Sequence, residues 1–113
     1  MSRFALILYP NFSLQEVTCL TSALAVWFGE EIDYIASENK EYCSEEGLRV
    51  VPTKTMADIN ITDYDCVILP GTINPLPALY DERLIDFLKS GINTDVVFAA
   101  ISSSPLLLAK AGV

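Results

Sequence analysis

The chain has 113 residues, of which 51% are hydrophobic and 19% charged, enough for one small domain with an apolar core. Fifteen acidic and seven basic residues give a formal net charge of −8, and the basic residues are scattered. Nucleic acids and anionic membranes attract clustered Lys and Arg, so we expect neither kind of partner.

The cysteine and histidine content bears on metals and location. The chain has three cysteines and no histidine, and Cys19, Cys43 and Cys66 form no CxxC pair. We therefore expect no metal site and no cofactor. An odd number of cysteines is typical of a reducing compartment, and the apolar run at residues 4–8 is too short for a signal peptide or a membrane span. These features predict a cytoplasmic protein.

The N-terminal segment predicts a buried strand followed by a helix. Residues 3–9 form a continuous apolar run, the pattern of a strand covered on both faces. Ser13 and Glu16 then have the spacing of a capping box. Apolar residues at helical spacing, ending at Trp27, predict a helix over residues 14–28.

The middle of the chain predicts shorter elements. Residues 32–36 read as a second strand, and residues 48–51 as a short strand able to form a β-ribbon with the segment around Tyr42. Residues 52–63 look irregular, with one helical turn near Ala57. A further buried strand is expected at residues 66–69.

The last third of the chain predicts a loop, two helices and a strand. Two prolines in residues 72–79 indicate a loop, and residues 81–89 form an amphipathic helical pattern. The apolar run that starts after Asp95 predicts the last strand. Pro105 stands in the first turn of the last helix, where proline is favourable.

Three serines, Ser102 to Ser104, separate this last strand from the helix. Such a short connection requires a very tight turn, which would push the Ser102 side chain out at the carboxyl end of the strand. The backbone N–H groups that follow would point at whatever Ser102 touches.

Apolar strands that alternate with helices predict a parallel sheet with helices on both faces. Ligands of such doubly wound proteins bind beyond the carboxyl ends of the strands, at the topological switch point. Three loops should converge there: residues 10–16, residues 70–74 and the turn at Ser102. This convergence is the main indication of function.

Together, these segments resemble the ThiJ/PfpI superfamily, relatives of the class I glutamine amidotransferases, over nearly the whole chain. The resemblance rests on Glu16 early in the first helix, on YDCVILPG at residues 64–71 and on AAISSSP at residues 99–105. It implies an α/β fold, a flavodoxin-like three-layer αβα sandwich with a mainly parallel sheet, as a single domain over residues 1–113. It also implies a homodimer. Since the family pattern continues beyond Val113, we expect the chain to lack the C-terminal part of the domain.

The resemblance also implies roles for individual residues. Ser102 takes the nucleophile position, Glu16 supplies the carboxylate, and the N–H groups of Thr72 and Ser103, beside Gly71, form the oxyanion pocket. The sequence departs from the family pattern at three positions: Ser102 replaces cysteine, and Ser104 and Thr72 replace glycines.

These departures leave two functions open. A serine hydroxyl needs an adjacent general base, and the chain has no histidine to act as one. One hypothesis is a non-catalytic or weakly active small-molecule-binding module related to stress responses. The alternative is a hydrolase or lyase that acts on small amide or carbonyl compounds through Ser102 and Glu16. Whether the chain is an enzyme is not decided by its sequence.

Overall fold

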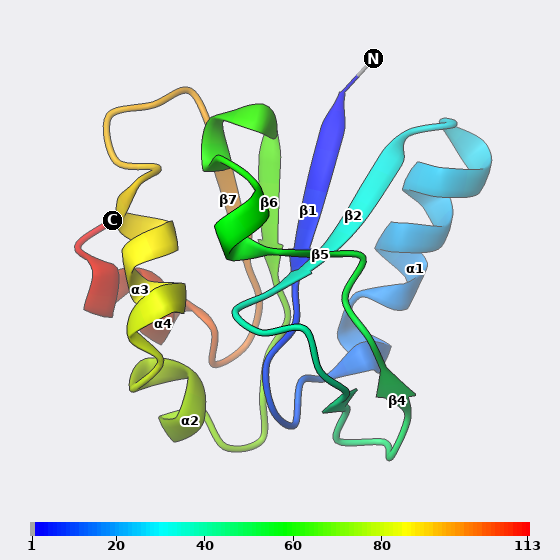
Figure 1. The fold of residues 1–113 in the computed structure, drawn as a ribbon. Coiled ribbons are helices and arrows are strands. Elements are labelled where there is room, and N and C mark those ends of the chain that lie inside the picture. The colour runs from blue at the N-terminus through cyan, green and yellow to red at the C-terminus, as the bar shows by residue number, and fades with distance from the viewer. Residues whose placement is uncertain (1) are drawn as a thin grey trace.

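A computed structural model describes residues 2–113, which form a sheet with the strand order β5-β2-β1-β6-β7 (Figure 1). All four pairings in this sheet are parallel, which confirms the predicted flavodoxin-like α/β fold. In chain order, the strands of the sheet are β1 (Arg3–Ile7), β2 (Glu31–Ala36), β5 (Lys54–Thr55), β6 (Cys66–Leu69) and β7 (Val97–Ala100).

Helices cover the two faces of the sheet (Figure 1). On one face lies the continuous run η1 (Leu14–Glu16), α1 (Thr18–Ser22) and η2 (Ala23–Trp27); on the other lie α2 (Leu76–Leu79), α3 (Glu82–Lys89) and α4 (Pro105–Ala111). The remaining elements are the ribbon of β3 (Tyr42–Cys43) and β4 (Arg49–Val50) and the helical turns η3 (Met56–Asp58) and η4 (Ile61–Asp63). No helix within residues 2–113 is long and apolar enough to cross a membrane.

The core forms where the central strands are covered by helices on both sides. Leu6 of β1 lies beside Ile68 of β6, and both side chains are at most 1% exposed. Leu88 of α3 and Leu107 of α4 are completely buried on the face of the sheet that α2, α3 and α4 cover. Burial on both faces explains why β6 and residues 4–7 of β1 are uninterrupted apolar runs rather than alternating ones.

The predicted helix over residues 14–28 is present but irregular. Its last part is a π-helix, in which the Phe28 N–H donates to the Ala23 carbonyl five residues earlier, at 3.1 Å. The wider turn departs from the 3.6-residue period on which the prediction rested. Val17, at the start of the run, is buried, whereas Trp27, at its end, is 82% exposed and does not pack in the core.

Two other predictions were wrong in detail. The expected loop at residues 72–79 contains the short helix α2, because Pro77 lies in its first turn, where no intrahelical N–H donor is needed. The stretch expected to be irregular contains strand β5. Only two residue pairs join β5 to β2, too few to produce a recognisable pattern.

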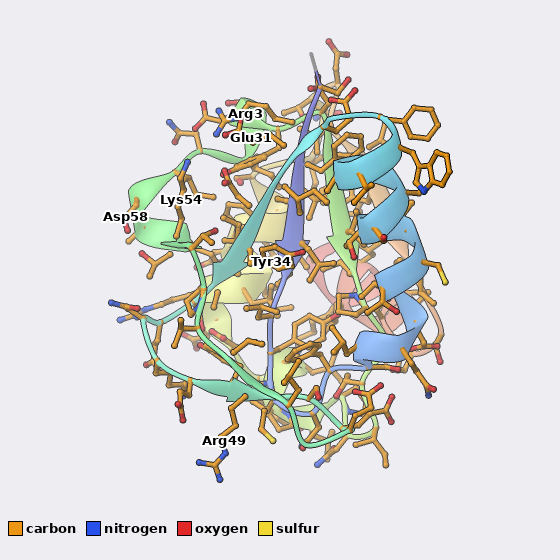
Figure 2. All side chains as sticks on the ribbon, turned by 90° about the vertical axis from the view of Figure 1, so that its right-hand side faces the viewer. Arg3, Glu31, Tyr34, Arg49, Lys54 and Asp58 are labelled. Atoms are coloured by element: carbon orange, nitrogen blue, oxygen red, sulfur yellow. The ribbon has the colours of Figure 1, made fainter. Side chains whose placement is uncertain are left out.

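A cluster of charges lies in the amino-terminal half of the sheet. The Asp33 carboxylate accepts hydrogen bonds from Tyr64 Oη at 2.7 Å, Lys54 Nζ at 3.1 Å and Arg3 Nη2 at 3.2 Å. Figure 2 shows Arg3, Glu31 and Lys54 in the upper part of the view, where Arg3 and Glu31 form the first pair of β1 and β2. Burial alone would raise the pKa of Asp33, but the hydrogen bonds from Tyr64, Lys54 and Arg3 outweigh it and lower the pKa.

Candidate functional site

The strand order places a switch point at β1. The chain leaves β1 toward β2 on one side and leaves β6 toward β7 on the other, so the loops that follow β1 and β6 separate at their carboxyl ends. In doubly wound sheets, this crevice is where ligands bind. The segments containing Glu16, Gly71 and Ser102 all begin at this edge.

The turn between β7 and α4 has the tight geometry that the sequence predicts. Ser102 has φ 60°, in the left-handed region that costs a non-glycine residue about 1–2 kcal/mol. Its side chain is exposed, and its hydroxyl makes no hydrogen bond within residues 2–113. The surrounding structure therefore holds this side chain outward at the end of the sheet.

Ser104 holds the turn in place. Its side chain is completely buried, and its Oγ accepts a hydrogen bond from the Ile101 N–H at 2.6 Å. The carbonyl oxygens of Leu69 and Ile101 lie 2.8 and 2.7 Å away as acceptors for its one proton. A glycine at this position would provide none of these contacts, so Ser104 has a structural role.

Gly71 is the point at which the three segments meet. A Cβ atom built on Gly71 would overlap Glu16 Oε1 and lie 2.9 Å from the Ser102 Cβ atom. The Gly71 carbonyl also accepts a hydrogen bond from the Ser13 N–H at 2.7 Å, which ties the loop before η1 to the loop after β6. Glu16 and Ser102 thus lie on the same side of Gly71, although no hydrogen bond joins them within the described residues.

Tyr9 is hydrogen-bonded to the loop that follows β6. Its hydroxyl donates to the Pro70 carbonyl, and the residue is only 2% exposed. Burial raises the pKa of Tyr9 well above its ordinary value, and the negative charge of Glu16 raises it further. The Tyr9 hydroxyl therefore remains protonated and keeps donating to Pro70.

The N-terminus of the helical run is capped differently from the prediction. The Ser13 side chain accepts no capping hydrogen bond, and its buried Oγ has no partner among the described residues. Instead, the carboxylate of Glu46 accepts hydrogen bonds from the N–H groups of Leu14 at 3.1 Å and Gln15 at 2.9 Å. The Gln15 N–H is the main cause of the lowered pKa of Glu46. Glu46, from the turn after β3, thereby positions the segment that carries Glu16.

Of the two N–H groups expected to form an oxyanion pocket, one is already hydrogen-bonded and the other is not. The Ser103 N–H has no hydrogen-bond acceptor within residues 2–113 and lies next to the exposed Ser102. The Thr72 N–H donates to Ser103 Oγ at 3.1 Å, and that hydroxyl donates back to the Thr72 carbonyl at 2.9 Å. In this conformation, a ligand has one of the two donors available.

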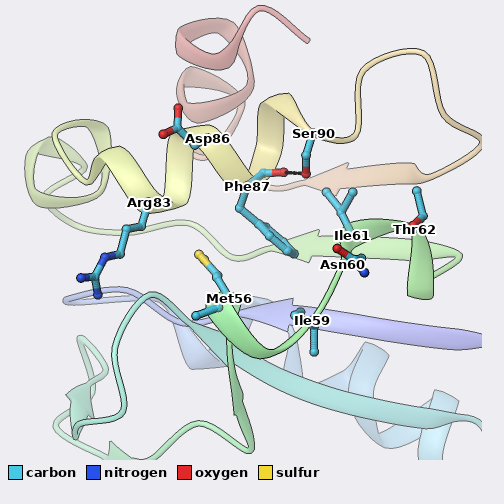
Figure 3. Close-up of a pocket in the computed structure, with 10 residues that line it drawn as sticks. Met56, Ile59, Asn60, Ile61, Thr62, Arg83, Asp86, Phe87 and Ser90 are labelled. Atoms are coloured by element: carbon cyan, nitrogen blue, oxygen red, sulfur yellow. Dashed lines mark hydrogen bonds between the residues drawn. The ribbon is translucent and has the colours of Figure 1, made fainter.

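A cavity of about 600 Å³ lies away from this site, between the segment of residues 56–62 and helix α3 (Figure 3). Phe87 projects from α3 toward Met56 and Ile61 on the facing segment. None of the five predicted site residues lines this cavity. Within residues 2–113, no three histidine, cysteine, aspartate or glutamate side chains are grouped as metal ligands.

Comparison with known proteins agrees with the fold. The model of the DJ-1/PfpI family matches residues 2–113. The chain belongs to the DJ-1/PfpI family. Among relatives of this family member, the DJ-1 protein homolog E of Arabidopsis thaliana is 43% identical over 104 residues, covering 92% of the chain and 24% of that protein.

Two further comparisons involve more distant DJ-1/PfpI proteins. The glutathione-independent glyoxalase DJR-1.2 of Caenorhabditis elegans is 24% identical, over 96% of this chain and 59% of the nematode protein. The crystal structure of a DJ-1 superfamily protein from Agrobacterium tumefaciens has the same fold, with a TM-score of 0.86 and 24% identity over 99% of this chain and 59% of that one. This DJ-1/PfpI chain thus spans less than two thirds of each of these three proteins.

The sequence did not reveal every residue that shapes the site. Nothing in a local pattern links Glu46 to the start of η1, 31 and 32 residues away. The hydroxyl of Ser103 was also overlooked, because the family resemblance concerns only its backbone N–H. Three serines in succession at a turn were the available signal, since hydroxyl groups at turns commonly bond to nearby backbone.

Proposed function

We propose that this DJ-1/PfpI chain binds a small carbonyl or amide compound at the site beside Gly71, without efficient catalysis. The observation that carries the proposal is the meeting of Glu16 and Ser102 at Gly71, next to the unpaired N–H of Ser103. A ligand carbonyl oxygen would accept from the backbone N–H, and a ligand N–H or O–H would donate to the Glu16 carboxylate.

The chemistry of Ser102 argues for binding rather than turnover. A serine hydroxyl reacts only when a neighbouring base removes its proton, and the chain has no histidine. Glu16 lies close to Ser102 but accepts no hydrogen bond from it in this structure. The site therefore contains recognition groups without an assembled nucleophile and base.

The alternative is a hydrolase or lyase for small amide or carbonyl compounds, favoured by the closeness of Glu16 to Ser102 and by the glyoxalase among the relatives. In the hydrolase case, Ser102 Oγ would attack the carbonyl carbon while its proton passed to Glu16. The leaving amine would then take that proton, and water would hydrolyse the resulting ester.

We expect the wild-type protein to bind acetamide in preference to acetate, because the Glu16 carboxylate accepts from an amide N–H but repels an anion. Glu16→Gln should shift the acetate-to-acetamide affinity ratio about fivefold toward acetate, the effect of about 1 kcal/mol between two water-exposed charges about 4 Å apart. Titrations followed by the amide NMR signals of Gly71, Thr72 and Ser103 measure both affinities.

Glu31→Gln is the matched control for this titration, since it removes the same charge at the opposite end of the sheet (Figure 2). It should leave the affinity ratio unchanged. Absence of acetamide-induced shifts at the site would refute binding there. Covalent labelling of Ser102 by a fluorophosphonate, lost in Ser102→Ala, would instead favour the hydrolase.

The proposal includes self-association as a homodimer. It is supported by Val26, Trp27 and Phe28, which are 75%, 82% and 72% exposed at the end of η2. We expect sedimentation velocity to show a dimer at micromolar concentration and the Trp27→Ser variant to be more monomeric. Tyr80→Ser, an equally exposed aromatic after α2 on the other face, should retain the dimer. A wild-type chain that remains monomeric contradicts this part of the proposal.

A further inference from the structure

The side chain of Ser103 is hydrogen-bonded to the backbone of Thr72, and both residues belong to the predicted site. Ser103 Oγ lies 3.1 Å from the Thr72 nitrogen and 2.9 Å from the Thr72 carbonyl oxygen, and it bonds to both. One hydroxyl thus accepts from the N–H and donates to the C=O of the same residue. A hydroxyl has the donor and the acceptor sites that this arrangement requires.

This contact makes the Thr72 N–H less available to a ligand. A backbone N–H carries a single hydrogen, and a second acceptor can share it only with poorer geometry. While Ser103 Oγ accepts from the Thr72 N–H, a ligand oxygen has only the Ser103 N–H available at full strength. Ser103 therefore contributes one group that binds a ligand oxygen and another that competes with it.

Thr72 is held independently of Ser103. Its Oγ1 lies 3.0 Å from the Pro10 carbonyl and 3.2 Å from the Asn74 carbonyl, and its backbone forms a bridge with Phe12. The Thr72 N–H should therefore keep its position when Ser103 Oγ leaves. By contrast, Ser103 is half-buried at an open edge, so rotation about its χ1 angle moves the hydroxyl without moving the backbone.

We infer that the Ser103 hydroxyl is an internal competitor at the site beside Gly71, which occupies the Thr72 N–H until a ligand carbonyl oxygen displaces it. This inference rests on the proposed binding function and adds a regulation of that site. The bound state would have two backbone donors on the ligand oxygen, from Thr72 and Ser103. The unliganded state would have its otherwise unpaired Thr72 N–H satisfied by the side chain.

The test compares Ser103→Ala with the wild type by NMR. In the unliganded variant, the Thr72 amide should exchange with solvent several-fold faster, because it has lost its acceptor. Acetamide should bind three- to tenfold more tightly to Ser103→Ala, the factor that one net hydrogen bond represents. Ser22→Ala, which removes an exposed hydroxyl from α1, should change neither quantity.

Equal or weaker acetamide binding by Ser103→Ala would overturn the inference, because the hydroxyl would then be neutral or part of the ligand contacts. Unchanged exchange of the Thr72 amide would overturn it as well. Ser103→Gly gives a second measurement should the alanine variant be poorly folded. If neither wild type nor variant binds acetamide, the binding function fails and the competitor role with it, while the exchange rates still report the Ser103–Thr72 contact separately.

Discussion

Replacing Asp33 by alanine is expected to lower the free energy of unfolding by about 2–3 kcal/mol, measured by urea denaturation at pH 7. The Asp33 carboxylate is the shared acceptor for Arg3, Lys54 and Tyr64, and the residue is 9% exposed. Without it, the buried Tyr64 hydroxyl loses its partner, and two cations lose the charge that balances them. The heads of Arg3 and Lys54 remain partly hydrated, which keeps the loss below that of a fully buried ion pair.

The same cluster predicts a pH dependence. The pKa of Asp33 is lower in the folded chain than the value of about 3.9 expected when unfolded. Its stabilising effect is therefore fully present above the unfolded pKa and is lost as the pH falls through the folded pKa. The stability difference between wild type and Asp33→Asn should shrink as the pH is lowered below about 4.

Glu38→Gln is the matched control for Asp33→Asn. Glu38 forms an ion pair with Lys40, but both side chains are more than half exposed. Its removal should leave the unfolding midpoint unchanged within error, because such surface pairs contribute little. A change in stability for Asp33→Asn no larger than for Glu38→Gln would show that the cluster does not stabilise the fold.

Gly71→Ala is expected to weaken acetamide binding at least tenfold, because the added methyl group meets Glu16 Oε1 and lies 2.9 Å from Ser102 Cβ. Glu16 is exposed and can swing away, which removes the carboxylate from the pocket. Ser102 belongs to a constrained turn and can yield only with a backbone shift. We expect this overpacking to lower the free energy of unfolding by about 1–3 kcal/mol.

A double variant separates the two effects of the methyl group. Ser102→Gly removes the Cβ atom that the methyl group meets, and glycine adopts φ 60° without strain. Gly71→Ala combined with Ser102→Gly should therefore be more stable than Gly71→Ala alone, yet still bind acetamide weakly. Wild-type affinity in the Gly71→Ala single variant would place the ligand away from Gly71.

The sequence predicted the elements that can be recognised from a short run of adjacent residues. Residues 4–7 of β1 and all of β6 are apolar because helices cover both faces of these central strands, and such runs are visible without a structure. The apolar run of β7 also marked a strand, although this edge strand is only partly buried. The short path from β7 to Pro105 likewise implied a tight turn, and Ser102 has the left-handed backbone that such a turn requires. The irregular end of the first helix was not predicted, because the π-helical turn breaks the period on which the prediction relied.

The sequence by itself determined the α/β architecture, because apolar strands alternate with helical patterns along the chain. It also indicated the family, through the resemblance of three motifs, and the three loops expected at the carboxyl ends of the strands. Only the tertiary structure decided which side chains complete the site. Glu46 caps η1 in place of Ser13, and the Ser103 hydroxyl bonds to Thr72, 31 residues away. Contacts of this kind depend on the distance and direction of individual polar atoms once the chain has packed.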